Sequence, residues 1–139
     1  MAMIRHLAFR CADKEKSHRF YQDVIGFEFV GYRGPDKTVD LTDGTSNITL
    51  IQQPPELLEG REQFEEGREF IHVGLIVDDL GPIWERLHES GAEFTRENIK
   101  ARNPIDPTVQ PPRSFKVCDP DGNTIDITNK HDEWNGVTV

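Results

Sequence analysis

The sequence predicts an α+β fold in which two βαβββ units follow one another along the chain. Three observations support this: an opening strand pattern that occurs twice, a helix that ends at a glycine in each copy, and a late hairpin in each copy. The length of 139 residues suits a single domain. Within it we expect a first unit at 3–53, a connector at 54–69, a second unit at 70–129 and a tail at 130–139.

The opening strands of the two units align without a gap. Residues 4–13 and 70–79 place His6 opposite His72 and Asp13 opposite Asp79, in each case 66 positions apart. Both segments are short and apolar and lead to an aspartate. An aspartate at this place is typical of the residue that begins a helix.

A helix is expected after each opening strand. Residues 20–25 and 83–87 carry apolar side chains at helical spacing with charged or polar side chains between them. Gly26 and Gly91 stand where a left-handed residue would end each helix, and Pro82 suits the first turn of the second helix.

Each unit is expected to finish with a hairpin. In the first unit, residues 39–42 and 47–51 flank the turn Asp43-Gly44. In the second, residues 114–118 and 124–128 flank a turn at 119–122, which aligns Thr49 with Asp126. Residues 54–68 are expected to form a short helical connector on the surface. Residues 96–113 are expected to form a functional lid or a partly disordered loop.

Strand parity predicts which residues share a face, because successive side chains of a strand point to opposite sides. In the first strand, His6 and Arg10 point away from the helix. The same parity places Thr49, His72 and Asp126 on the non-helical face of their own strands. Two imidazoles and a carboxylate there predict a divalent metal site with up to three positions open for substrate or oxygen. The alternative is that each histidine is a satisfied structural residue of its strand.

Composition and charge exclude several classes of protein. A hydrophobic share of 35% and a charged share of 29% are typical of a soluble globular protein. The net charge of −9 argues against nucleic acid or an anionic membrane as the partner. There is no apolar run of ~18–20 residues, and we expect no signal peptide. Cys11 and Cys118 form no CxxC pair, which excludes a disulfide scaffold and favours the cytoplasm.

The double βαβββ pattern, the segment FYQDVIGFEF and the segment DPDGNTIDI resemble the vicinal oxygen chelate superfamily. This group includes glyoxalase I, bleomycin-resistance proteins, fosfomycin-resistance enzymes, methylmalonyl-CoA epimerase and extradiol dioxygenases. The resemblance covers residues 4–128 and implies a funnel-shaped mixed sheet with helices on its outer face. It also implies a homodimer with two sites, in which strand exchange can build one site from both chains.

The resemblance implies metal ligands on the first and fourth strand of each unit, at the positions of His6, Thr49, His72 and Asp126. Glyoxalase I-like enzymes carry glutamate at the position of Thr49, and threonine is a poor ligand. A slipped register would bring Gln52 or Gln53 there instead, but the repeat alignment favours Thr49. We therefore expect three protein ligands, as in the dioxygenases and the fosfomycin-resistance enzymes: His6, His72 and Asp126.

The expected metal is Fe, Mn, Zn or Ni, acting as a Lewis acid on a small oxygenated metabolite that binds through adjacent oxygens. Asp126 stands where the family usually has glutamate, so the metal would lie closer to that strand or be met through water. Thr49 is then left to contact substrate. Arg10, Arg102 and Arg113 are candidates for binding an anionic substrate, and Arg10 shares the parity of His6. No residue is assigned as the catalytic base.

Several functions fit these residues. The first is a metal-dependent enzyme of the dioxygenase or transferase kind, with a glyoxalase I-like lyase or an epimerase behind it. Another class is a metal-free protein that sequesters a ligand, as the bleomycin-resistance proteins do, and the acidic charge would suit a cationic drug. A third is a degenerate member kept for a protein–protein role.

Overall fold

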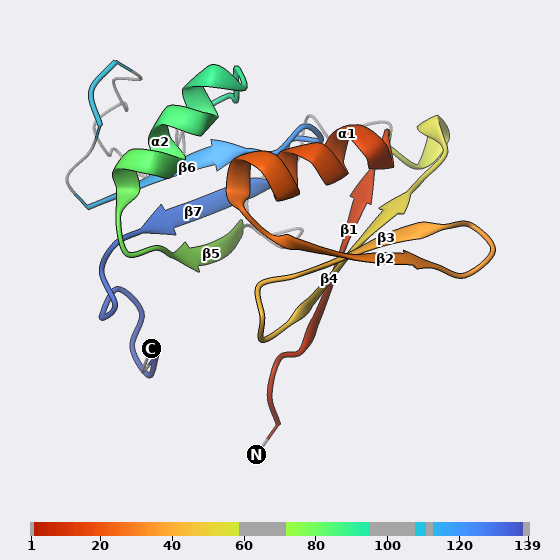
Figure 1. The fold of residues 1–139 in the computed structure, drawn as a ribbon, viewed down its shortest axis with the longest axis horizontal. Helices are drawn as coiled ribbons and strands as arrows, with labels where there is room; N and C mark the ends of the chain where they lie inside the picture. The colour runs from red at the N-terminus through yellow and green to blue at the C-terminus, as the bar shows by residue number, and fades with distance from the viewer. Residues whose placement is uncertain (1, 59–71, 95–107, 111–112, 138–139) are drawn as a thin grey trace. The chain divides into compact units, whose positions relative to one another are not determined.

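The computed structural model describes residues 2–58, 72–94, 108–110 and 113–137. The chain divides into two compact units, Met1–Glu62 and Gln63–Val139, which are described one at a time (Figure 1). The division falls within the stretch 54–69 that separates the two repeats in the sequence. None of the helices among the described residues has the length and hydropathy of a membrane-spanning helix.

The first unit is a four-stranded mixed sheet in the order β1-β4-β3-β2 (Figure 1). Strand β1 runs parallel to β4, and the other neighbouring strands are antiparallel. The hairpin of β3 and β4 is the one that the turn Asp43-Gly44 predicts. The strands are β1 His6–Cys11, β2 Glu28–Arg33, β3 Thr38–Thr42 and β4 Asn47–Gln52.

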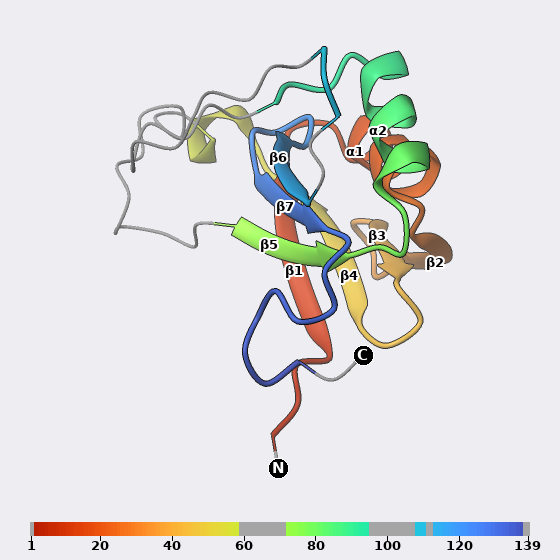
Figure 2. The same ribbon diagram turned by 90° about the vertical axis from the view of Figure 1, so that its left-hand side faces the viewer.

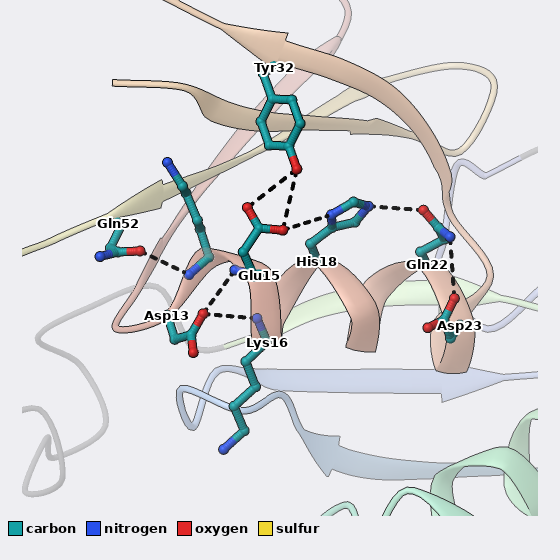
Figure 3. A network of polar contacts seen from close by, with 9 residues as sticks. Asp13, Glu15, Lys16, His18, Gln22, Asp23, Tyr32 and Gln52 are labelled. Atoms are coloured by element: carbon teal, nitrogen blue, oxygen red, sulfur yellow. Dashed lines mark hydrogen bonds and ion pairs between the residues drawn. The ribbon is translucent and has the colours of Figure 1, made fainter. Parts of the chain in front are cut away.

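The helix of the first unit consists of α1, Lys14–Arg19, followed by a π-helical turn η1, Phe20–Ile25. It begins at Asp13, whose carboxylate accepts hydrogen bonds from two backbone N–H groups of the first turn at 3.0 Å (Figure 3). It ends at Gly26, which has a φ of 99° and confirms the predicted left-handed position. The wider π-helical turn was not predicted, because a single turn is too short to show a periodicity of its own in the sequence.

The helix covers one face of this sheet. It packs against β3 and β4, and Tyr21 stacks between the rings of Phe9 and Phe27 at centroid distances of 5.6 and 5.9 Å. Leu41 and Leu50 are fully buried beneath it. The opposite face of the sheet is therefore the one that His6 occupies.

The second unit contains a three-stranded sheet in which β7 lies between β5 and β6 (Figure 2). Strand β5 is parallel to β7, and β6 is antiparallel to it. Helix α2 begins after Asp79 and ends before Gly91, and its Trp84 packs on Phe115 of β6 with the ring centroids 5.1 Å apart. The elements are β5 His72–Ile76, α2 Leu80–Glu89, β6 Ser114–Cys118 and β7 Thr124–Thr128.

Two predicted segments are described only in part. The strand expected after Gly91 is represented by a single antiparallel bridge between Phe94 and Val117, and residues 95–107, Arg102 among them, lie outside the described residues. Of the expected connector, the structure describes one short 3-10 turn, η2 Pro55–Leu57.

Candidate functional site

Strand β1 confirms the predicted parity. His6, Ala8 and Arg10 are exposed, whereas the residues between them are half-buried under the helix. Ala8 pairs with Thr49 of β4, so Thr49 lies on the same face as His6. The slipped register that would have brought Gln52 to this position is therefore wrong.

Gln52 instead lies at the end of β4, where its side-chain oxygen accepts the backbone N–H of Lys14 at 3.2 Å (Figure 3). An open groove of about 820 Å³ lies beside it. None of the predicted ligands lines this groove, so it is separate from the face that carries His6. The lining residues are Ala12, Lys14, Asp36, Gln52, Gln53, Pro54, Pro55 and Leu58.

A chain of hydrogen bonds crosses the His6 face of the first sheet. The His6 ring is 2.6 Å from the Asn47 side chain, between Nδ1 and Oδ1. Thr49 Oγ1 lies 3.0 Å from the same Asn47 oxygen and 2.6 Å from Asp40 Oδ1. Asp40 is on β3, directly opposite Thr49 in the register of the sheet.

Arg33 closes this chain of contacts at the β2 edge. Its Nε and Nη2 lie 3.0 and 3.1 Å from the two oxygens of Asp40, which is a bidentate arrangement. Nη2 also donates to Thr49 Oγ1 at 2.7 Å. Thr49 is only 1% exposed, and its hydroxyl lies in contact with Arg33, Asp40 and Asn47.

The surroundings of Asp40 favour its ionised form. Burial alone raises the pKa of a carboxyl, but hydrogen bonds from Thr49 and Asn47 and the charge of Arg33 outweigh it, and the pKa of Asp40 lies below its usual range. Asp40, Asn47 and Arg33 were not among the predicted site residues. Parity within the predicted hairpin was the available signal, since it places Asp40 and Asn47 on the face of Thr49.

The second unit brings together His72 and Asp126, as parity predicts. His72 Nε2 is 3.8 Å from Asp126 Oδ2, and Lys116 Nζ of β6 is 3.7 Å from the same oxygen. Lys116 pairs with Asp126 in the register between β6 and β7. Within the part of the chain that the structure describes, the buried Nδ1 of His72 has no hydrogen-bond partner.

The tail covers part of this second face. A Cβ placed on Gly74 would lie 2.6 Å from Cη2 of Trp134, so the indole ring lies directly on the glycine. Gly74 is the register partner of Asp126, which puts Trp134 beside the His72 and Asp126 pair. The tail is held by Arg113, whose Nε lies 2.7 Å from Glu133 Oε2. The guanidinium expected to bind substrate is thus engaged by a carboxylate.

Cys118 is not a reactive thiol. Burial, followed by the nearby carboxylates of Glu93 and Asp119, raises the pKa of Cys118 to about 11. A thiol with this pKa is almost entirely protonated at neutral pH and is a poor nucleophile and a poor metal ligand.

Comparison with known proteins places this arrangement in a family. Residues 3–127 match the family model of the Glyoxalase/Bleomycin resistance protein/Dioxygenase superfamily. The chain belongs to this superfamily. The family and the α+β fold that the residue patterns predicted are therefore confirmed.

Individual members of the superfamily are distant from this chain. The lactoylglutathione lyase of Haemophilus influenzae is 27% identical over 124 residues, which are 82% of this chain and 88% of the lyase. The uncharacterized protein YwkD of Bacillus subtilis is 32% identical over 97 residues, or 65% of this chain and 73% of YwkD. The fosfomycin resistance protein FosX of Listeria monocytogenes has a TM-score of 0.67 at 17% identity, covering 96% of this chain and 94% of FosX.

The structure places on strands the four residues that the resemblance implied as metal-ligand positions. His6 and Thr49 lie on β1 and β4, and His72 and Asp126 lie on β5 and β7. Among the described residues, neither unit by itself brings three His, Cys, Asp or Glu side chains together to hold a metal ion.

The second unit fits a metal after a small adjustment. Two ligands of one ion at ~2.1 Å stand about 3–3.5 Å apart, whereas His72 Nε2 and Asp126 Oδ2 are 3.8 Å apart. The separation in the structure is therefore about 0.3–0.8 Å wider than a shared metal ion requires. Lys116 is the competing cation at the same oxygen and would have to give way to the ion.

Proposed function

We propose that this superfamily member is a metal-dependent enzyme that binds a small oxygenated metabolite through adjacent oxygens. Its metal ligands are His6, His72 and Asp126, and the ion is Fe, Mn, Zn or Ni. The observation that supports this most is the His72 and Asp126 pair, whose atoms face each other on the sheet face opposite the helix. A bound divalent ion would supply Lewis acid chemistry, stabilising negative charge on the substrate oxygens.

The first unit offers the imidazole of His6 as a metal ligand but no fourth ligand. Among the described residues, nothing bonds Nε2 of His6, because its ring contact is made through Nδ1. Thr49 is buried and in contact with Asp40, Asn47 and Arg33, and β4 carries no carboxylate that could serve as a fourth ligand. This favours the three-ligand count of the dioxygenases and of the fosfomycin-resistance enzymes.

Substrate contacts are proposed at Arg10, Thr49 and Arg113. Arg10 is exposed on β1, on the face of His6, and a guanidinium there suits a carboxylate or phosphate group. Arg113 would have to exchange its contact with Glu133 for one with substrate. Thr49 is buried, so a substrate oxygen would have to displace the Arg33 guanidinium to reach the Thr49 hydroxyl.

A glyoxalase I-like lyase is the second candidate. It is favoured by several relatives named lactoylglutathione lyase, which align with about four fifths of this chain. The lyase and the first candidate differ in their substrates, but both functions require His72 and Asp126.

We also propose a homodimer in the cytoplasm. A chain of this length carries only two repeats, and pairing of two such chains is the usual way in which the superfamily completes its sites. Cys11 and Cys118 are not joined in a disulfide, which suits a reducing compartment.

The test is elemental analysis of protein purified without a metal-chelating tag, for the wild type and for His72→Ala and Asp126→Asn. We expect about one equivalent of Fe, Mn, Zn or Ni per chain in the wild type and a loss in both variants. The matched control is His131→Ala, since His131 is an exposed histidine of the tail. Circular dichroism checks that each variant is folded.

Activity is then tested with the metal that is found. Formation of the lactoylglutathione thioester from methylglyoxal and glutathione would select the lyase. Wild-type protein that stays metal-free after incubation with each of the four ions would contradict the enzyme proposal. Ligand binding that persists in such protein would favour the metal-free binder of the bleomycin-resistance type.

A further inference from the structure

The contact between His6 and Asn47 has a direction. At 2.6 Å, His6 Nδ1 and Asn47 Oδ1 share one proton, and an amide oxygen can only accept. The proton therefore resides on Nδ1. In a neutral imidazole, the other nitrogen is then an unprotonated lone pair, so Nε2 is free to bind a ligand.

The opposite orientation of the Asn47 amide would reverse this result. A flipped amide would turn its N–H groups toward His6, and the ring would then accept on Nδ1 and carry its proton on Nε2. A ring with its proton on Nε2 must change tautomer before that nitrogen can bind a metal ion. The orientation of the Asn47 amide therefore affects how readily His6 serves as a ligand.

The neighbours of Asn47 disfavour the flip. Asn47 donates a hydrogen bond to the Asp40 carboxylate, so its amide N–H groups point toward Asp40 while its oxygen faces His6. After a flip, the amide oxygen would instead face the Asp40 carboxylate, and two oxygen acceptors would oppose each other. Arg33 holds this carboxylate in place through both of its oxygens.

We propose that Asn47 and Asp40 are positioning residues for His6: Asp40 orients the Asn47 amide, and the amide holds His6 with its proton on Nδ1 and Nε2 free. This inference rests on the proposed function for its purpose, since the free nitrogen is the one offered to a metal ion. Its geometry belongs to the first unit alone.

The second unit provides an internal contrast. The buried Nδ1 of His72 has no partner among the described residues, and the Asp126 carboxylate faces the ring through Nε2 instead. No described residue therefore fixes the proton of His72 on Nδ1. Changes at Asn47 should alter the tautomer of His6 and leave that of His72 as it is.

The tautomers are measured by long-range ¹H–¹⁵N NMR of metal-free protein with labelled histidine. The pH is about 8.5, well above the ~6.5 at which an ordinary imidazole titrates. His6→Gln and His72→Gln assign the two rings by loss of their signals. We expect His6 in the wild type as the Nδ1–H form, and an Nε2–H form there would overturn the proposal.

Three variants test the residues separately. Asn47→Leu removes the acceptor and should move His6 toward the Nε2–H form, whereas Asn47→Asp keeps an acceptor and should retain Nδ1–H. Asp40→Asn removes the charge that orients the amide and should give a mixture of the two forms. Asp36→Asn, which changes an exposed carboxylate outside the network, is the matched control for Asp40→Asn. An unchanged His6 signal in Asn47→Leu or Asp40→Asn would overturn the role of the residue concerned.

Metal binding supplies a second readout. Loss of the partner that orients a ligating histidine typically costs 10–100-fold in metal affinity, so Co²⁺ titration of Asn47→Leu should show a loss of this size. Equal Co²⁺ affinity in the wild type and in Asn47→Leu would overturn the positioning role. Wild-type protein that keeps the Nδ1–H form but binds no ion would contradict the proposed function while supporting the positioning of His6.

Discussion

Replacing Gly74 by alanine should displace Trp134 from the face that carries His72 and Asp126. Gly74 lies on β5, and the indole ring covers the space that a side chain would need. A Cβ there would stand 2.6 and 2.7 Å from two carbons of the ring. Carbon atoms in contact normally stand about 3.5–4.0 Å apart, so the overlap is close to 1 Å.

The cost follows from two opposing effects. Overpacking of this kind costs about 1–3 kcal/mol, whereas alanine in place of glycine gains about 0.4–1 kcal/mol by restricting the unfolded chain. We therefore expect Gly74→Ala to lower the free energy of unfolding by about 1–2 kcal/mol. In a Trp134→Ala background the overlap is absent, and the same substitution should become stabilising by about 0.4–1 kcal/mol.

The assay combines urea unfolding with ¹⁹F NMR of protein labelled with 5-fluorotryptophan. The chain has two tryptophans, so Trp134→Phe assigns both signals. Gly74→Ala should shift the Trp134 signal and leave that of Trp84. Gly81→Ala is the matched control, because its Cβ would meet nothing closer than 3.4 Å. If Gly74→Ala costs the same in the presence and absence of Trp134, the ring does not lie on Gly74.

Two further predictions follow from shifted pKa values. Because the pKa of Asp40 is lower in the folded state, its contribution to stability is full above the unfolded pKa of ~4 and is lost as pH falls through the folded value. Urea unfolding should therefore show Asp40→Asn less stable than the wild type at pH 7, with the difference closing in acid; a difference that grows in acid would contradict this. With Cys11 replaced by serine, Cys118 should react with a thiol reagent at pH 8 on the order of 100-fold more slowly than a thiol of ordinary pKa. Its rate should rise about tenfold per pH unit up to about 11, and a plateau near pH 8.5 would contradict the shift.

The strands, helices and shared faces were predictable because they depend on local patterns. The two hairpins of the structure match the predicted ones, and Gly26 and Gly91 end the helices with positive φ. Strand parity depends only on alternation along the chain, so it correctly placed His6 and Arg10 on one face and His72 with Asp126 on another.

The partners of these residues were harder to predict, because they depend on the register between strands. Asp40 meets Thr49 only through the pairing of β3 with β4, and Arg33 reaches them from β2 across a register shift near Gly31. The contact of Trp134 with Gly74 joins residues 60 positions apart and leaves no periodic signal in the sequence.

The two repeats place their charged side chains differently. In the first unit the carboxylate is Asp40 on β3, and its strand neighbour on β4 is the neutral Thr49. In the second, the carboxylate is Asp126 on β7 and its neighbour on β6 is the cation Lys116. Each carboxylate therefore has a cation beside it, but only the one in the second unit faces a histidine directly. The carboxylate of the first unit, Asp40, can affect metal binding only by orienting His6. The carboxylate of the second unit, Asp126, can bind the ion directly once Lys116 has moved. In a Co²⁺ titration, Lys116→Met should accordingly raise the metal affinity, because Asp126 loses its competing cation. Arg33→Met should lower the metal affinity, because Asp40 is no longer held in place to orient Asn47 and, through it, His6.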